Sequence, residues 1–223
     1  MLKSFTDQIF LCEKPFTLFG IPMRLRSTII RDGQGRLAIH SPVEFSEDEL
    51  TSIKSLGTVE QVLAPSLFHH LFLGPTREHF PNAKYLSCPG LESKKKGFSF
   101  DGTILDSKLS EDFDTVLVGG SPKINEVVIY HKPSGTLIVT DLIFNLHGIS
   151  GAVNSFFSMM GGVYNKATIC RLFRFHIRNK SAFSQSLDEI NDLPFKHIIM
   201  SHGEPIRGEG KAAFAKVRDQ VSL

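Results

Sequence analysis

Three apolar, strand-like stretches of this chain, far apart in the sequence, each end in side chains that can bind a metal ion. The first closes with His69 and His70, the second with Asp141 and the third with His202. Strands packed in a sheet hold such side chains at fixed positions, which loops alone do not. The pattern therefore favours a fold that gathers these strand ends at one edge of packed sheets, and it predicts a metal site there.

The size and charge of the chain limit what it can bind. Its 223 residues are 41% apolar, enough for one well-filled core, so we expect a single domain over residues 1–223. Lysine and arginine number 25 against 23 acidic residues. This balance supplies no field that would attract nucleic acid or an acidic membrane, and it favours a small-molecule substrate. A second copy of the chain, in a homodimer, stays open as a partner.

The cysteines and the N-terminal residues bear on the compartment. The chain has 3 cysteines, widely spaced and in no Cys-x-x-Cys pair, which argues against a disulfide framework and favours a reducing environment. The first ten residues lack the unbroken apolar stretch of a secretory signal. The stretch 148–163 is too short and polar to span a bilayer. We therefore expect a soluble, cytoplasmic protein.

Hydrophobic periodicity and turn residues predict the elements. In the first half we expect strands at 8–13, 25–31 and 37–40, a turn at 32–35, a helix at about 46–56, a strand before His70, a helix near 74–80 and a strand at 84–87. In the second half we expect strands at 115–118, 126–131 and 136–140, a helix at about 181–191, a strand at 197–200 and a helix ending near 220. Two strand-rich halves, each followed by helices, predict sheets packed face to face with helices outside.

Several segments resemble the metallo-β-lactamase fold. The run Ser-Leu-Phe-His-His-Leu-Phe-Leu from Ser66, followed by Phe-Pro-Asn-Ala-Lys-Tyr from Phe80, resembles the family segment in which His-x-His-x-Asp-His precedes a helix. The run from Leu137 to Phe144 resembles the segment with the bridging aspartate, and Ser201-His202-Gly203 resembles the terminal Ser-His-Gly. The resemblance covers about residues 25–205. It implies a four-layer αββα sandwich, and it is greatest for a divergent branch described as a domain of unknown function.

This chain departs from the family pattern at the first metal position. When His70 is aligned with the last histidine of the motif, Pro65 and Leu67 replace the first two histidines, and neither can ligate a metal. The stretch from Gly119 to Pro122 lacks the histidine that the family carries in its next ligand segment. The resemblance therefore implies that the first metal position is absent.

The second metal position is retained in the alignment. The resemblance implies that His69, His70, Asp141 and His202 are its ligands and that one divalent metal binds per chain. Three imidazoles and a carboxylate suit zinc, which we favour, and also iron(II), manganese or nickel. Adjacent residues diverge on a regular strand or helix, so His69 and His70 can share a metal only if the chain turns sharply there.

A metal with one open position activates water and polarises a carbonyl or phosphoryl oxygen. We therefore expect a hydrolase of a small ester, lactone, thioester or phosphoester. Asp141 would bind the metal and orient water, and Glu126 and His147 are candidates for proton transfer from their positions alone. Two alternatives stay open: a mononuclear non-haem iron oxidoreductase, which uses a similar ligand set, and a non-catalytic binding protein whose metal site has decayed.

Other polar and apolar groups have less specific interpretations. His40, at a strand end, either orients metal ligands or is an ordinary edge histidine. The lysines at 94–96 and the arginines at 171, 174 and 178 are anion-binding groups or an exposed basic face. Residues 144–180 are expected to form a cap or insertion that carries specificity. Within this region, the Phe- and Met-rich stretch at 156–160 is interpreted as a cap over the site, as a dimer surface or, preferably, as core packing.

Overall fold

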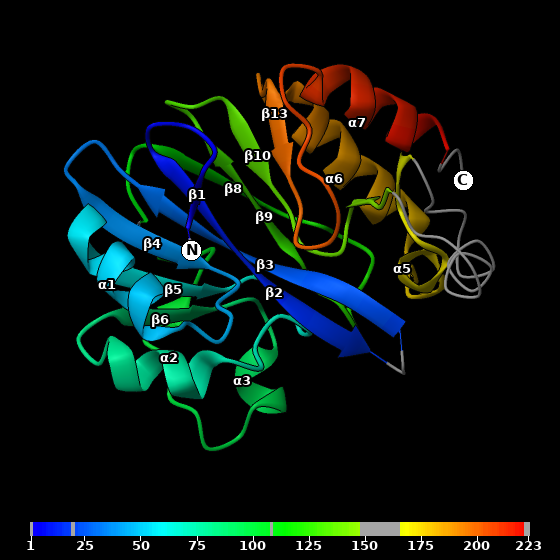
Figure 1. Ribbon diagram of the computed structural model, residues 1–223. Coiled ribbons are helices and arrows are strands. Elements are labelled where there is room, and N and C mark those ends of the chain that lie inside the picture. The colour runs from blue at the N-terminus through cyan, green and yellow to red at the C-terminus, as the bar shows by residue number, and fades with distance from the viewer. Residues whose placement is uncertain (1, 19–20, 108, 148–165, 221–223) are drawn as a thin grey trace.

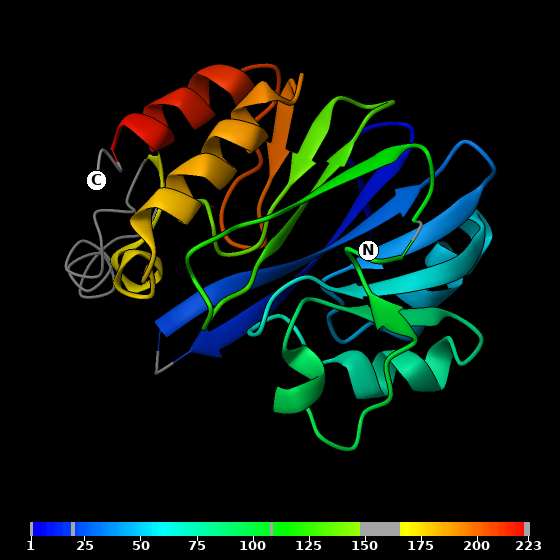
Figure 2. The ribbon, with the colours of Figure 1, turned by 180° about the vertical axis from the view of Figure 1, so that it is seen from behind.

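Two β-sheets lie face to face in the computed structural model, which describes residues 2–18, 21–107, 109–147 and 166–220. Figure 1 shows α1 (Glu47–Leu56), α2 (Leu73–His79) and α3 (Leu91–Lys94) on the outer side of the larger sheet. Figure 2 shows α6 (Lys180–Asp192) and α7 (Gly210–Asp219) against the outer face of the smaller one. This arrangement confirms the predicted αββα sandwich.

The larger sheet brings the ends of two strands to the edge at which the candidate site lies. It has the order β1 (Lys3–Ser4), β2 (Ile9–Leu18), β3 (Ile21–Arg31), β4 (Arg36–His40), β5 (Thr58–Ala64), β6 (Lys84–Ser87) and β7 (Gly102–Thr103). Strands β1 to β4 pair antiparallel, whereas β4 to β7 pair parallel. The carboxyl ends of β4 and β5 therefore meet at one edge, where Ser41 and the segment leading to His69 begin.

The smaller sheet brings two further strand ends together. It has the order β13 (His197–Ile199), β10 (Thr136–Ile138), β9 (Val127–His131) and β8 (Phe113–Leu117). Strands β10 and β13 pair parallel, with Leu137 opposite Ile198, so Asp141 and His202 follow at the same edge. Two short strands, β11 (Phe144–Asn145) and β12 (Ala167–Thr168), form a separate antiparallel pair.

Four helices, α1, α2, α6 and α7, lie close to the predicted positions, whereas α3 and α5 (Arg171–Phe175) were not predicted as helices. At the start of α1, the Ser46 hydroxyl accepts a bond from the Glu49 amide while the Glu49 carboxylate accepts one from the Ser46 amide. This reciprocal cap is the one that the Ser-x-x-Glu spacing favours.

Alternate side chains of the smaller sheet pack into two different hydrophobic cores. Val127 and Ile129 of β9 belong to the core between the sheets, whereas Val128 and Tyr130 belong to the core beneath α6 and α7. Successive side chains of a strand point to opposite faces, so a strand buried on both sides is apolar throughout. This explains why the first four residues of β9, Val127 to Tyr130, are all apolar or aromatic.

The region expected to form a cap is only partly described. Residues 148–165, which include the Phe- and Met-rich stretch, lie outside the described residues; the rest of 144–180 contains β11, β12 and α5. The single-domain boundary at 1–223 stays a prediction. None of the helices in the described ranges is long and apolar enough to cross a lipid bilayer.

Candidate metal centre

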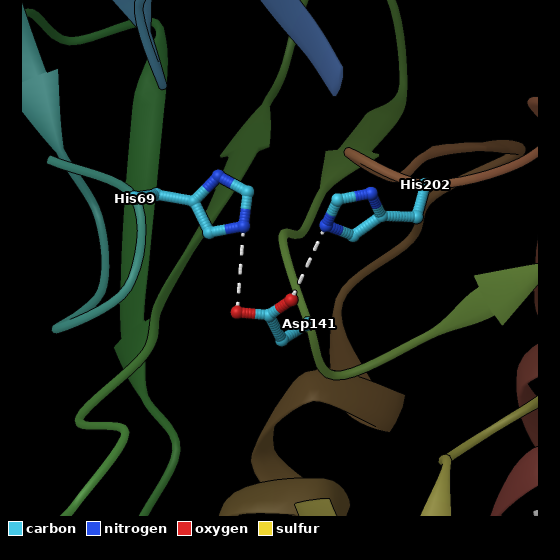
Figure 3. Close-up of side chains that lie close together, drawn as sticks. All are labelled: His69, Asp141 and His202. Atoms are coloured by element: carbon cyan, nitrogen blue, oxygen red, sulfur yellow. Dashed lines mark ion pairs between the residues drawn. The ribbon is translucent and has the colours of Figure 1, made fainter. Parts of the chain in front are cut away.

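Three of the four predicted metal ligands come together at the edge where the strand ends meet. Donor atoms of His69, Asp141 and His202 all lie within 4.8 Å of one another. Figure 3 shows both imidazoles turned toward the Asp141 carboxylate, with Nε2 of His69 3.4 Å from Oδ2 and Nε2 of His202 3.5 Å from Oδ1. Segments more than sixty residues apart thus converge on one point.

The spacing of these donor atoms suits a metal ion better than direct hydrogen bonds. Good N–H···O bonds span about 2.7 to 3.2 Å, so both separations are long for such a contact. Zinc binds nitrogen and oxygen at about 2.0 to 2.1 Å, and two ligands of a tetrahedral ion are then about 3.3 to 3.4 Å apart. Each nitrogen-to-oxygen distance is close to that value, with the two imidazoles facing different oxygens of the same carboxylate, and Oδ2 of Asp141 is buried with no hydrogen-bond partner among the described residues.

The orientation of His69 is set by two serines. The Ser66 hydroxyl accepts bonds from the amides of Phe68 and His69, which turns the chain after β5. The Ser41 hydroxyl lies 2.7 Å from Nδ1 of His69, which leaves Nε2 free to face Asp141. Ser41 itself has a φ of 53°, a left-handed conformation that is costly for serine.

His202 is fixed in the tautomer that a metal requires. Its Nδ1 lies 2.8 Å from the carbonyl oxygen of Arg24, which only accepts, so Nδ1 carries the proton and Nε2 keeps its lone pair. The ring also stacks on Phe144, with centroids 5.2 Å apart and planes 10° apart. The next residue must be glycine, because a Cβ on Gly203 would lie 2.2 Å from the carbonyl oxygen of Asn145.

A buried arginine holds the segment that carries His202. Arg26 of β3 is 3% exposed, and its guanidinium donates to the carbonyls of Met200 and Gly203 and to the Glu13 carboxylate. Burial opposes ionisation of Glu13, but the bonds from Arg26 and Lys3 lower its pKa to about 2.

Glu126 supports Asp141 from beneath the site. Its carboxylate accepts bonds from the amides of Thr140, Asp141 and Leu142 at 2.5, 2.9 and 2.8 Å. Burial and the charge of Asp141 raise the pKa of Glu126 to about 7. The side chain has no exposed surface, and its role in proton transfer stays a prediction.

The charge of Asp141 is stabilised by its neighbours. Burial alone would raise its pKa, but His69 and His202 hold the pKa of this carboxyl well below its usual range. A carboxylate kept ionised between two imidazoles is the form that binds a divalent cation.

The remaining predicted site residues lie outside the three clustered side chains. His70 is not among the three clustered donors; it lines the adjoining cleft, and burial together with Lys94 and Lys95 lowers its pKa. His147 is exposed, and its Nε2 lies 2.9 Å from Oδ1 of Asn145. His40 is buried next to Ser41, and burial and His69 lower its pKa to about 3. The residue beside it, Ser41, makes the contact to a candidate ligand.

The three clustered side chains open onto a cleft of about 390 Å³, within the range of small-molecule sites. The lining comes from both halves of the chain and is largely apolar. It consists of Phe16, Leu25, Ser41, Pro42, Val43, Phe68, His69, His70, Leu71, Phe72, Lys94, Ile124, Asp141, Phe144, Cys170, Leu172, Phe173, His176 and His202.

The family model for a domain of unknown function, DUF4336, matches residues 6–156. The chain belongs to this family. No curated protein sequence matches this DUF4336 chain.

Solved structures show which fold this DUF4336 chain adopts. A metallo-beta-lactamase from Pontibacter korlensis is similar at a TM-score of 0.67 and 11% identity, over 99% of this chain and 98% of that one. One from Hirschia baltica has a TM-score of 0.65 and 11% identity, over 98% and 97%. FIM-1 from Pseudomonas aeruginosa, in its mono-zinc form, has a TM-score of 0.66 and 9% identity, over 100% and 96%. At such low identity these similarities show the metallo-β-lactamase fold and nothing finer.

The described part of this DUF4336 chain has no second cluster of three metal-binding side chains. Pro65 and Leu67, which the family resemblance aligns with the first two histidines of the motif, are both buried. The glycines that replace the next ligand segment pack instead against α6, because a Cβ on Gly120 would lie 2.0 Å from the carbonyl oxygen of Asn179. The glycines of this segment therefore allow the chain to pack closely against α6.

Proposed function

We propose that this chain is a metal-dependent hydrolase with a mononuclear site, acting on a small ester, lactone, thioester or phosphoester. His69, Asp141 and His202 are the ligands in this proposal. The observation that carries it is the spacing of two imidazole nitrogens from the oxygens of one carboxylate, 3.4 and 3.5 Å, at the bottom of a cleft. The proposal uses three of the four ligands expected from the sequence, because His70 is not among the side chains whose donor atoms cluster.

Each ligand is held by its own partner. The Ser41 hydroxyl and the Arg24 carbonyl fix the two imidazoles, and Glu126 fixes the turn that carries Asp141. A divalent ion with three protein ligands keeps a position for water, whose pKa it lowers toward neutrality. Zinc is favoured. The apolar lining limits competing water around a bound substrate.

One observation also favours a second function. Mononuclear non-haem iron enzymes bind their metal through two histidines and one aspartate or glutamate. The three clustered side chains of this chain are of the same types. An iron-dependent oxidoreductase is therefore the alternative. A binding protein with a decayed site would hold no metal at all.

Metal analysis separates these functions. Protein purified without chelator is analysed for bound metals by mass spectrometry, then assayed for hydrolysis of p-nitrophenyl acetate and for oxygen consumption after loading with zinc, manganese or iron(II). About one zinc or manganese per chain with ester hydrolysis supports the proposal. Iron with oxygen-dependent turnover would establish the alternative, and a site that stays empty after loading would contradict both.

The matched variants are Asp141→Asn and His79→Ala. Asp141→Asn keeps the shape of the side chain but removes its charge, and we expect it to abolish hydrolysis and metal retention. His79 lies at the end of α2 and does not line the cleft. Equal losses in both variants would contradict the proposed ligand set.

A further inference from the structure

Exposed apolar side chains gather at the mouth of the cleft. Phe68, Leu71 and Leu172 are 45%, 56% and 44% exposed and line it. Only two other large apolar side chains of the described residues are exposed, and one of them, Phe175, is on the same short helix as Leu172. Exposed apolar groups that cluster around a cavity mark a surface that another molecule covers.

The interior of the cleft continues this apolar surface. Phe72 and Val43 contribute from the first half of the chain, and Phe144 and Phe173 from the second. Phe144 also stacks on His202, so the apolar surface reaches a candidate metal ligand. A molecule whose reacting group lies at His202 therefore has its remaining part against aromatic rings.

The charged groups of the described lining are already paired. Lys94 donates to the carbonyl oxygen of Leu67, and its ammonium lies 4.9 Å from the centroid of the Phe68 ring. The Asp141 carboxylate faces the two imidazoles. A substrate that carries its own negative charge would have to displace the Lys94 contacts or leave its charge unpaired, which is costly in an apolar cleft.

We propose, on the basis of the proposed hydrolase function, that the substrate is an uncharged ester or thioester with an apolar acyl arm. The arm lies between Phe68 and Leu172 and reaches toward Phe144, and the reacting carbonyl lies at the three clustered side chains. Hydrolysis joins the water oxygen to the acyl carbon, breaks the bond from that carbon to the leaving oxygen or sulfur, and returns one proton to the leaving group. The other proton goes to solvent. The acid product is anionic, and the apolar cleft favours its release.

A binding measurement tests the ligand class without any catalysis. Metal-free protein is titrated with the uncharged fluorophore N-phenyl-1-naphthylamine, which is then displaced by methyl octanoate or by monomethyl suberate, an eight-carbon acid ester with a terminal carboxylate. We expect displacement by methyl octanoate at a concentration at least tenfold lower. Equal displacement by both esters, or no binding of the fluorophore, would overturn the proposal.

Two alanine variants locate the binding surface. We expect Phe68→Ala to weaken fluorophore binding about fivefold or more, because an aromatic ring is lost at the mouth. Leu105→Ala is the control, since Leu105 is also exposed but does not line the cleft, and it should bind as the wild type does. Equal weakening in both variants would contradict binding at this surface.

A chain-length series separates this inference from the function on which it rests. With p-nitrophenyl esters from acetate to octanoate and metal-loaded protein, we expect kcat/KM to rise up to about fourfold for each added methylene until the cleft is filled. Hydrolysis with no dependence on chain length would overturn the apolar arm and leave the hydrolase function standing. Apolar binding without hydrolysis under any metal would overturn the function and uphold the ligand class.

Discussion

Single contacts decide which of two adjacent histidines faces Asp141. The hydroxyl of Ser66 turns the backbone at residues 66–69, and Ser41 then holds Nδ1 of His69. His70, one residue later, also lines the cleft but is not in the cluster with Asp141 and His202. The sequence predicts that the histidine pair lies at the site. It does not predict which of the two histidines faces Asp141, because that depends on the backbone conformation of an irregular segment. The role of Ser41 was not predicted either, because its only distinguishing feature in the sequence is its position directly after a histidine at the end of a strand.

The Ser41 contact should govern metal affinity. In Ser41→Ala the imidazole of His69 loses the partner that fixes its orientation, and we expect metal binding to weaken about 10- to 100-fold. Ser27→Ala is the control, because Ser27 is also buried but its hydroxyl donates to the carbonyl oxygen of His40. Zinc titration calorimetry measures both. Unchanged affinity in Ser41→Ala would show that the contact does not orient His69.

Whole elements position the other two ligands. Parallel pairing of β10 with β13 brings Asp141 and His202 to one edge, and the sequence predicted both strands and both ligand positions. It did not predict that Arg26 of β3 anchors the β13 end through the carbonyls of Met200 and Gly203. Contacts from a side chain to a distant backbone leave no periodic pattern. The two-residue strands β1, β7, β11 and β12 were also not predicted, because they are too short to show one.

Removal of the Arg26 anchor should weaken both folding and the metal site. In Arg26→Gln the partly buried Glu13 carboxylate and the buried Met200 carbonyl lose the guanidinium that contacts them, and we expect the free energy of unfolding to fall by about 3 to 5 kcal/mol. Arg24→Gln is the matched control: Arg24 contacts the same Glu13, but its side chain is 68% exposed, and we expect a loss below about 1 kcal/mol. Urea unfolding measures both. A similar small loss in the two variants would contradict the anchoring role.

At the scale of the whole molecule, buried histidines should make the fold sensitive to acid. Burial lowers the pKa of His131 to about 4, although Asp112 and Asp32 oppose this shift. The unfolded chain then binds a proton near pH 6.5 that the folded chain does not. Stability is therefore fully present above about pH 6.5 and is lost as the pH falls toward 4, at up to about 1.4 kcal/mol per pH unit for this group.

The test compares unfolding free energies from urea titrations at pH 7.5, 6.0 and 5.0, with chelator present. His131→Gln should show a shallower decrease with falling pH than the wild type, by about one proton. His131 pairs with Thr136, at the end of β10 opposite to Asp141, and packs against Phe113, so metal does not enter the comparison. Identical slopes for the two proteins would contradict a neutral, buried His131.

In the proposed site, His69, Asp141 and His202 together hold one divalent metal. The most direct measurement is the stoichiometry and affinity of zinc, by titration calorimetry on metal-free protein, for the wild type, His69→Ala, His202→Ala and His70→Ala. We predict one zinc per chain in the wild type, a loss of about 100-fold or more in affinity for His69→Ala and His202→Ala, and near wild-type binding in His70→Ala. Wild-type affinity in His69→Ala, or loss of binding in His70→Ala alone, would contradict the account.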